Sequence, residues 1–281
     1  MSQINLFLAL VCFICYIRTM GKEVGSKINR LLSSHPPGIV LLSSWLVKQG
    51  YSHDLQRRYR KSNWLQPIGT GALARTNDKV SYEGAIYALQ AQGGLSIHPG
   101  GRTALSLLGK AHYLELSASK VMLFGGSGEK LPAWFKKHDW GLKVDYYETS
   151  FLTQDIGLTE VEFKNFSIKV SGAARALMEC LYLAPHKQEL TECFELMEGL
   201  NNLQPKQVQT LLEDCQSVKV KRLFLYMAEK ANHSWFNYLD ITKIDLGKGK
   251  RSIVKNGVLV DKYGITVPKE LEAYGKDKAK Y

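Results

Sequence analysis

The segment from His53 to Arg75 reads HDLQRRYRKSNWLQPIGTGALAR and carries the strongest structural signal in the chain. Its first part predicts a short helix with several basic side chains, and its glycine-rich second part predicts a β-hairpin. A basic helix followed directly by such a hairpin is the arrangement with which a winged helix binds DNA. The helix supplies donors to base edges, and the hairpin contacts phosphate. The segment therefore predicts double-stranded DNA as a partner.

Two more helices are expected upstream, as a helix-turn-helix requires. The first lies at residues 26–34 and ends at a Pro-Pro pair, because proline cannot continue a helix. The second spans about residues 43–50. Ser52 then caps the basic helix, in which Leu55 and Tyr59 face inward and the basic residues occupy the remaining arc.

The hairpin is predicted around Gly69-Thr70-Gly71, with strand residues on both sides. Arg75 lies at its end, where its side chain can reach a phosphate. In the helix, the arginines suit guanine, and Gln56 or Asn63 suits adenine. The predicted DNA-binding residues are Gln56, Arg57, Arg58, Arg60, Lys61, Thr70 and Arg75.

The composition also favours a polyanionic partner. The chain has 281 residues, 45% of them hydrophobic, which suffices for about two domains with a sizeable core. Its formal net charge of +11 favours nucleic acid first and an anionic membrane surface second, over a merely soluble basic protein. Basic residues concentrate at residues 22–75, whereas acidic residues predominate at residues 171–215. This asymmetry indicates different partners for the two halves.

We predict an α+β protein in three parts. They are an apolar leader at residues 1–21, a winged helix-turn-helix at residues 22–94, and a larger mixed α/β domain at residues 95–281. In the third part, strands are expected at residues 113–116, 121–124, 143–147 and 163–170, and a helix at residues 131–137. Amphipathic helices are expected at residues 173–183, 189–200, 205–215 and 219–230, followed by short strands within residues 244–267.

The leader contains an apolar run, Ile4–Ile17, of 14 residues. A helix needs roughly 20 residues to span a bilayer, so the run is short for an anchor. It resembles a signal-peptide core, but no Lys or Arg precedes it and no suitable cleavage site follows. Because Met20 opens a sequence typical of a cytosolic start, we predict that residues 1–19 come from an upstream start codon and that the protein is cytoplasmic and nucleoid-associated. A membrane anchor or a secretion signal is the alternative.

The sequence predicts neither an enzyme nor a metal or cofactor site. Single cysteines on apolar helical patterns are expected to be reduced core residues. They are Cys180, Cys193 and Cys215. The Cys12/Cys15 pair lacks the second pair that zinc requires. The glycine run at residues 125–130 misses the phosphate-loop spacing and predicts a strand-to-helix turn. Glu160 and Glu162 suit a solvated strand edge better than a catalytic pair.

Several runs, in order along the chain, resemble the AbiEi antitoxins of type IV bacterial toxin–antitoxin systems. They are SNWLQPIGTGALAR (62–75), YEGAIYALQAQ (82–92), IHPGGRTALSLLGKAHYL (97–114), LFGGSGEKLPAWF (123–135), KRLFLYMAEKANHSWF (221–236) and DLGKGKRSIVKNGVLVDKYGITVP (245–268). The similarity covers about residues 22–268, and residues 1–19 have no counterpart in it.

The resemblance implies an N-terminal winged helix that binds inverted repeats in its own promoter and represses the operon. It further implies a C-terminal domain with the antitoxin activity, in a system of the phage abortive-infection type. The functional partner implied is a nucleotidyltransferase-like toxin, counteracted without a stable complex. The family's basic recognition-helix residues correspond to Arg57, Arg58, Arg60 and Lys61, and no catalytic residue or cofactor carries over.

Three alternatives stay open at this point. One is a one-component regulator whose C-terminal domain binds a small ligand. Another is an enzyme, for example one that acts on nucleic acid, that uses the winged helix for targeting. The third is a regulator tethered to a membrane through residues 4–17.

Overall fold

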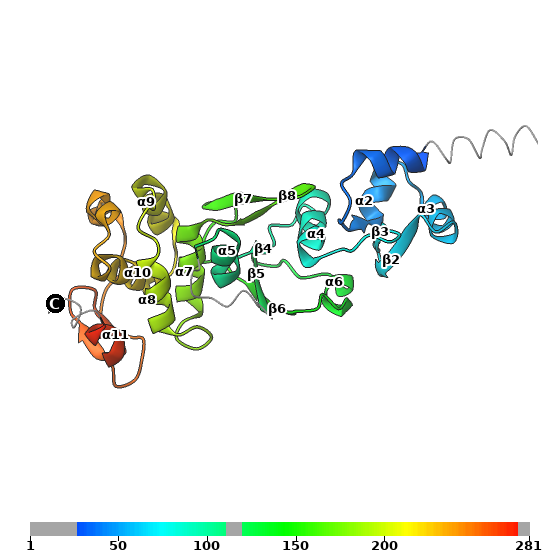
Figure 1. Ribbon diagram of the computed structural model, residues 1–281. Helices are drawn as coiled ribbons and strands as arrows, with labels where there is room; N and C mark the ends of the chain where they lie inside the picture. The colour runs from blue at the N-terminus through cyan, green and yellow to red at the C-terminus, as the bar shows by residue number, and fades with distance from the viewer. Residues whose placement is uncertain (1–26, 111–119, 275–281) are drawn as a thin grey trace, which may run out of the picture. The chain divides into compact units, whose positions relative to one another are not determined.

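The computed structural model describes residues 27–110 and 120–274, and these form an α+β protein (Figure 1). The predicted apolar leader, the Cys12/Cys15 pair and the predicted strand at residues 113–116 lie outside these ranges. Within them, no helix combines the length and the apolar character that crossing a membrane requires.

The described residues form two compact units. The first unit holds the described residues up to Ala88, together with Ala133–His138 and Lys164–Phe166. The second unit holds Leu89–Pro132, Asp139–Phe163 and the chain from Ser167 onward, as far as these are described. The first unit is therefore discontinuous in sequence, and two short segments from the second half of the chain complete it.

Three helices open the first unit, as predicted. Residues 27–34 are helical and are followed by α2 (Ser43–Lys48) and α3 (His53–Lys61). The Ser52 hydroxyl accepts a hydrogen bond from the Leu55 backbone N–H at 3.3 Å, which confirms the predicted cap of α3. Between α2 and α3, Gly50 adopts φ +85°, a left-handed conformation that lets the chain turn sharply.

A three-stranded antiparallel sheet completes the winged helix. Its strands are β1 (Leu41–Leu42), β2 (Leu65–Gly69) and β3 (Ala72–Arg75), in the order β1-β3-β2. Thr70 and Gly71 form the turn between β2 and β3, and Gly71 has φ +82°. The predicted glycine-turned hairpin is thus confirmed, and Figure 1 shows it beside α3 in the same blue-to-cyan part of the chain.

Apolar side chains from all of these elements share one core. Leu31, Leu46 and Leu65 are completely or almost completely buried, and Leu55 and Tyr59 face inward as predicted. Burial is the main reason why the pKa of Tyr59 rises to about 12. The remaining helices of the first unit are α4 (Tyr82–Tyr87) and α6 (Ala133–Lys137).

A mixed sheet begins the second unit. It consists of β4 (His98–Pro99), β5 (Lys120–Gly125) and β6 (Lys143–Glu148), with β4 antiparallel and β6 parallel to β5. In sequence, the π-helical turn η1 (Ala88–Gln92) follows α4, and α5 (Gly101–Leu107) follows β4. Strands β7 (Leu158–Phe163) and β8 (Phe166–Ser171) form a separate hairpin.

The predicted helical region is confirmed in the second unit. Its helices are α7 (Ala173–Leu183), α8 (Leu190–Glu198), α9 (Pro205–Asp214) and α10 (Val218–Lys230). Cys180, Cys193 and Cys215 are buried free thiols there, as the sequence predicts. Burial raises the pKa of the Cys193 thiol to about 12, so it stays protonated.

A small C-terminal sheet follows the helices, again as predicted. Its strands are β9 (Arg251–Ser252), β10 (Val258–Val260) and β11 (Ile265–Val267), in the order β10-β11-β9. The short helices η2 (Ser234–Tyr238) and η3 (Ile241–Lys243) precede the sheet, and α11 (Lys269–Ala273) follows it. The buried Arg222 of α10 holds this region by donating to the carbonyls of Leu246, Gly247 and Gly249. One guanidinium thus satisfies several backbone acceptors that the irregular chain leaves unpaired.

Candidate nucleic-acid interface

Helix α3 has one buried face and one cationic face. Leu55, Gln56 and Tyr59 are buried, and successive residues of an α-helix are about 100° apart. Arg57 and Lys61 therefore lie within about 30° of the direction opposite the buried residues. All of the predicted basic residues of α3 are exposed: Arg57, Arg58, Arg60 and Lys61.

Arg58 and Arg60 lie on opposite flanks of this outward face, about 70–90° from its centre. Basic residues in the last turn of a helix also offset its macrodipole, by about 0.3–1 kcal/mol each at low ionic strength. Arg58, Arg60 and Lys61 are in that turn. Their charge therefore has a structural use as well, and an experiment must separate this use from DNA binding.

The only acidic residue of α3, Asp54, lies in its first turn and pairs with Arg57. The Asp54 carboxylate oxygen is 2.7 Å from an Arg57 guanidinium nitrogen, and both side chains are well exposed, at 74% and 63%. Such an exposed pair is weak and is screened by salt. A phosphate or a guanine edge can therefore compete with Asp54 for the Arg57 guanidinium.

Gln56 does not lie on the exposed face of α3, although the sequence predicts it to be a DNA-binding residue. Its side chain is only 3% exposed, because position 56 falls on the buried arc beside Leu55 and Tyr59. Its amide accepts from the Ser43 hydroxyl at 2.6 Å and donates to the backbone carbonyls of Ser43 and Tyr51, at 3.1 and 2.8 Å. Gln56 thus joins the start of α2 to the turn before α3 and presents no amide to a base.

Arg75 also has an internal partner instead of pointing toward a phosphate. Its guanidinium donates to the backbone carbonyls of Leu32 and His35, at the end of the helix at residues 27–34. The last carbonyls of a helix have no partner inside it, and a cation is favourable at that end. Arg75 therefore fastens strand β3 to the first helix.

Thr70 lies in the turn at the tip of the hairpin, as the sequence predicts, and its side chain is exposed. Two further exposed residues on this part of the first unit were missed in the sequence. His53 is the first residue of α3, and the first turn of a recognition helix commonly contacts bases. Trp64 precedes β2 and is 46% exposed, whereas its neighbour Leu65 is buried. Asn63, the other predicted adenine reader, is exposed and ends α3 with φ +57°.

The buried ionisable cluster of the second unit is closed to ligands. Glu179 is 1% exposed and accepts from the Gly101 backbone N–H (2.8 Å), the Ser171 hydroxyl (2.8 Å) and Arg175 Nε (3.0 Å). Burial opposes its ionisation, but hydrogen bonding to His98 and the nearby charges hold the pKa of Glu179 below its ordinary value. With its acceptors occupied and no exposure, this carboxylate serves to join elements of the fold.

The glycine run at residues 125–130 forms the predicted turn between β5 and α6, and its amides are already occupied. The Gly126 N–H donates to the Glu129 carboxylate at 2.9 Å, and the Gly128 N–H donates to Glu148 at 2.6 Å. Carboxylates therefore take the positions that a phosphate would need. Among the described residues, no group of three His, Cys, Asp or Glu side chains could hold a metal ion.

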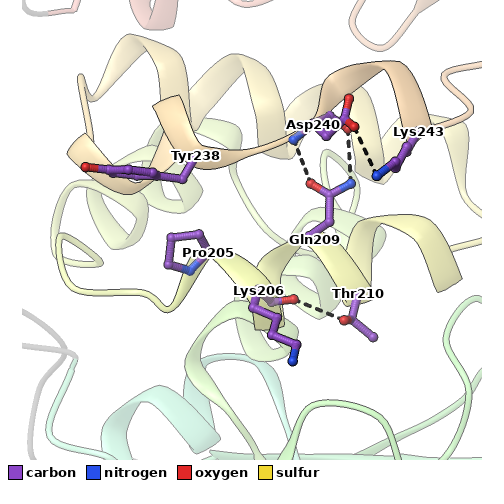
Figure 2. A pocket seen from close by; sticks show the side chains of 7 residues that line it. All are labelled: Pro205, Lys206, Gln209, Thr210, Tyr238, Asp240 and Lys243. Carbon is purple, nitrogen blue, oxygen red and sulfur yellow. Dashed lines mark hydrogen bonds and ion pairs between the residues drawn. The ribbon is translucent and has the colours of Figure 1, made fainter.

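A shallow hollow of about 490 Å³ lies between α9 and the η2–η3 segment of the second unit (Figure 2). Its lining residues are Pro205, Lys206, Gln209, Thr210, Tyr238, Asp240 and Lys243. The Gln209 amide exchanges two hydrogen bonds with the Asp240 backbone, and Lys243 pairs with the Asp240 carboxylate at 3.3 Å. These polar groups bind one another along the wall, so the hollow gives little support to a small-ligand site.

Two family models match consecutive parts of the chain. Residues 24–116 match the model described as transcriptional regulator, AbiEi antitoxin N-terminal domain. Residues 118–268 match the model described as transcriptional regulator, AbiEi antitoxin, type IV toxin–antitoxin system. The chain belongs to the AbiEi antitoxin family. The resemblance read from the sequence is thereby confirmed, and AbiEi proteins are regulatory antitoxins, not an enzyme family.

A solved structure shares the fold. The RV2827C protein from Mycobacterium tuberculosis is 13% identical, with a TM-score of 0.50 over 81% of this chain and 85% of that chain. At this identity the likeness concerns the fold alone. No curated protein matches this AbiEi chain.

Proposed function

We propose that this AbiEi-family protein binds double-stranded DNA through α3 and the β2–β3 hairpin and represses its own promoter by occupying inverted repeats there. The observation that carries the proposal is the outward face of α3. It presents Arg57 and Lys61 centrally, with Arg58 and Arg60 on its flanks, while Leu55 and Tyr59 anchor the helix from behind.

The proposed roles follow from these positions. Arg57 and Lys61 enter the major groove, where arginine and lysine are suited to guanine O6 and N7. Arg58 and Arg60 contact phosphates on either side, and Thr70 at the hairpin tip contacts a third position on the backbone. An inverted repeat presents two half-sites, so two protomers bind, about one helical turn or a multiple of it apart.

We assign a second activity, neutralisation of a nucleotidyltransferase-like toxin without a stable complex, to the part of the chain after about residue 94. Family membership across residues 118–268 supports this assignment. The acidic side chains of the region at residues 171–215 argue that its partner is not a polyanion. With both activities, the protein acts on the nucleoid in the cytoplasm.

The test is an electrophoretic mobility shift with the protein's own promoter. The variant Arg57→Ala/Arg58→Ala is expected to bind at least about tenfold more weakly, because the bidentate base contact of Arg57 contributes about 1–3 kcal/mol and loss of the Arg58 phosphate contact adds to this. The matched control, Lys206→Ala/Lys243→Ala, removes the same charge from exposed positions of the second unit. Circular dichroism of both variants establishes that they are folded.

The same variants separate the two activities. Cells that express the toxin from the adjacent reading frame should survive with the Arg57→Ala/Arg58→Ala protein, although their promoter is no longer repressed. An unchanged mobility shift for this variant would reject the DNA-binding assignment. Loss of protection together with loss of repression, in a folded protein, would reject the division of labour.

A further inference from the structure

Helix α6 occupies an unusual position in this fold. In sequence it connects β5 to β6, which are parallel neighbours in the sheet of the second unit. A helix that connects two such strands normally packs on their own sheet. Here Ala133–His138 belongs instead to the first unit, where α6 packs against β2 of the hairpin.

The contact between α6 and β2 is as close as two backbones permit. A methyl group at Gly69, the last residue of β2, would lie 2.8 Å from Trp134 Cβ and 3.1 Å from Trp134 Cα. Real Cβ atoms essentially never approach other atoms so closely. Gly69 does not have a positive φ angle, so it is the lack of space for a Cβ atom, and not the backbone conformation, that requires glycine here.

The aromatic side chains of α6 pack against each other and are buried. Trp134 and Phe135 are 6% and 1% exposed, and their rings meet edge to face with centroids 5.6 Å apart. Two large aromatic side chains of a five-residue helix are thus buried, and one of them belongs to Trp134, whose Cα and Cβ meet Gly69. Aromatic burial of this extent dominates local packing energy.

The hairpin has a reason to need such support. Strand β2 is an edge strand of a three-stranded sheet, it contains Pro67, and its pairing with β3 shifts register between Pro67 and Gly69. An edge strand with a proline and a register shift has few backbone hydrogen bonds to hold its end. The end concerned is the one that carries the proposed phosphate contact.

We propose that α6, through Trp134, is a positioning element of the DNA-binding surface that holds the hairpin in its binding orientation. The DNA-reading module is then discontinuous and includes residues 133–138 from the second half of the chain. This inference rests on the proposed function. Because the hairpin is held in place before DNA arrives, binding does not have to order it, and affinity increases accordingly.

The test uses the full chain with Gly69→Ala, which forces α6 away from β2, and Trp134→Ala, which removes the packed ring. Both variants are expected to bind the promoter about tenfold more weakly. Amide hydrogen exchange within β2 and β3 should quicken, while exchange in α7 and α10 stays unchanged. Ala133→Ser, an exposed and uncharged change on the same helix α6, is the control.

An added methyl group at Gly69 meets Trp134 Cα and Cβ, which Trp134→Ala keeps, so truncation of the Trp134 ring should not restore binding to the Gly69→Ala protein. Trp134→Phe, which keeps an aromatic ring, replaces Trp134→Ala if that protein does not fold. Folded variants with wild-type exchange in the hairpin and wild-type affinity would overturn the inference. A wild-type protein that does not shift its promoter would reject the proposed function instead, and hydrogen exchange would then decide on the role of α6 alone.

Discussion

The charge on α3 makes a quantitative prediction about salt. Each phosphate that a cationic side chain neutralises contributes about −0.9 to the slope of log affinity against log salt concentration. The outward face and flanks of α3 present Arg57, Arg58, Arg60 and Lys61 to solvent. Arg58 and Arg60 are the two proposed phosphate contacts of α3, so they contribute a slope of about −1.8 per protomer, or an affinity loss of about 12-fold between 50 and 200 mM salt.

The perturbation is Arg58→Gln/Arg60→Gln. It removes the two flanking charges, and glutamine has a helix propensity close to that of arginine. The contribution of α3 to the slope should fall to near zero, whereas Arg57→Gln/Lys61→Gln removes base contacts and should weaken binding with the slope nearly unchanged. Lys206→Gln/Lys243→Gln in the second unit makes the same change in net charge and should leave the slope unchanged.

The assay is fluorescence anisotropy of a labelled promoter duplex titrated with each protein at several salt concentrations. Thermal unfolding at each concentration separates any loss of helix stability at the C-terminal end of α3 from loss of DNA contacts. An unchanged slope in a folded Arg58→Gln/Arg60→Gln protein would refute the reasoning, because the flanking charges of α3 would then displace no counterions. An equal decrease of the slope in the control variant would show that only net charge matters.

Two further predictions concern stability. Gln56→Leu should lower the free energy of unfolding by about 1–3 kcal/mol in a urea titration, because the Ser43 hydroxyl and backbone carbonyls lose their buried partner; an unchanged midpoint would contradict this role. Glu179→Gln should cost about 3–5 kcal/mol at neutral pH, because it leaves Arg175 buried without its carboxylate. The folded pKa of Glu179 lies below its ordinary 4.5, so wild type loses this advantage as the pH falls below about 4.5, and the two unfolding curves should converge in acid. A difference independent of pH would exclude ionised Glu179 as its source.

Local patterns in the sequence predicted the elements of the winged helix well. The Ser52 cap, the inward spacing of Leu55 and Tyr59 and the Thr70-Gly71 turn depend on residues within one or two turns of each other. The same holds for the helices of the second unit, where apolar periodicity extends over ten or more residues. Short-range rules suffice in these places because the interactions themselves are short-range.

The roles of individual side chains were harder to predict. Gln56 and Arg75 are polar residues beside a basic helix and a hairpin, and the sequence alone favours exposure for both. Helix phase places Gln56 on the buried arc, and Arg75 donates to backbone carbonyls that lie 43 and 40 positions earlier in the sequence. A side chain goes to the partner that satisfies it, and these partners come from other elements.

The amino-acid pattern was enough to establish a cationic helix, its cap, a glycine-turned hairpin and membership of a regulator family. The tertiary structure was needed to show which polar side chains have partners inside the protein and that α6 packs on β2. The physical reason is range. Caps and periodicity act between neighbours in the chain, whereas the close approach of Gly69 to Trp134 joins segments whose sequence separation no local rule spans.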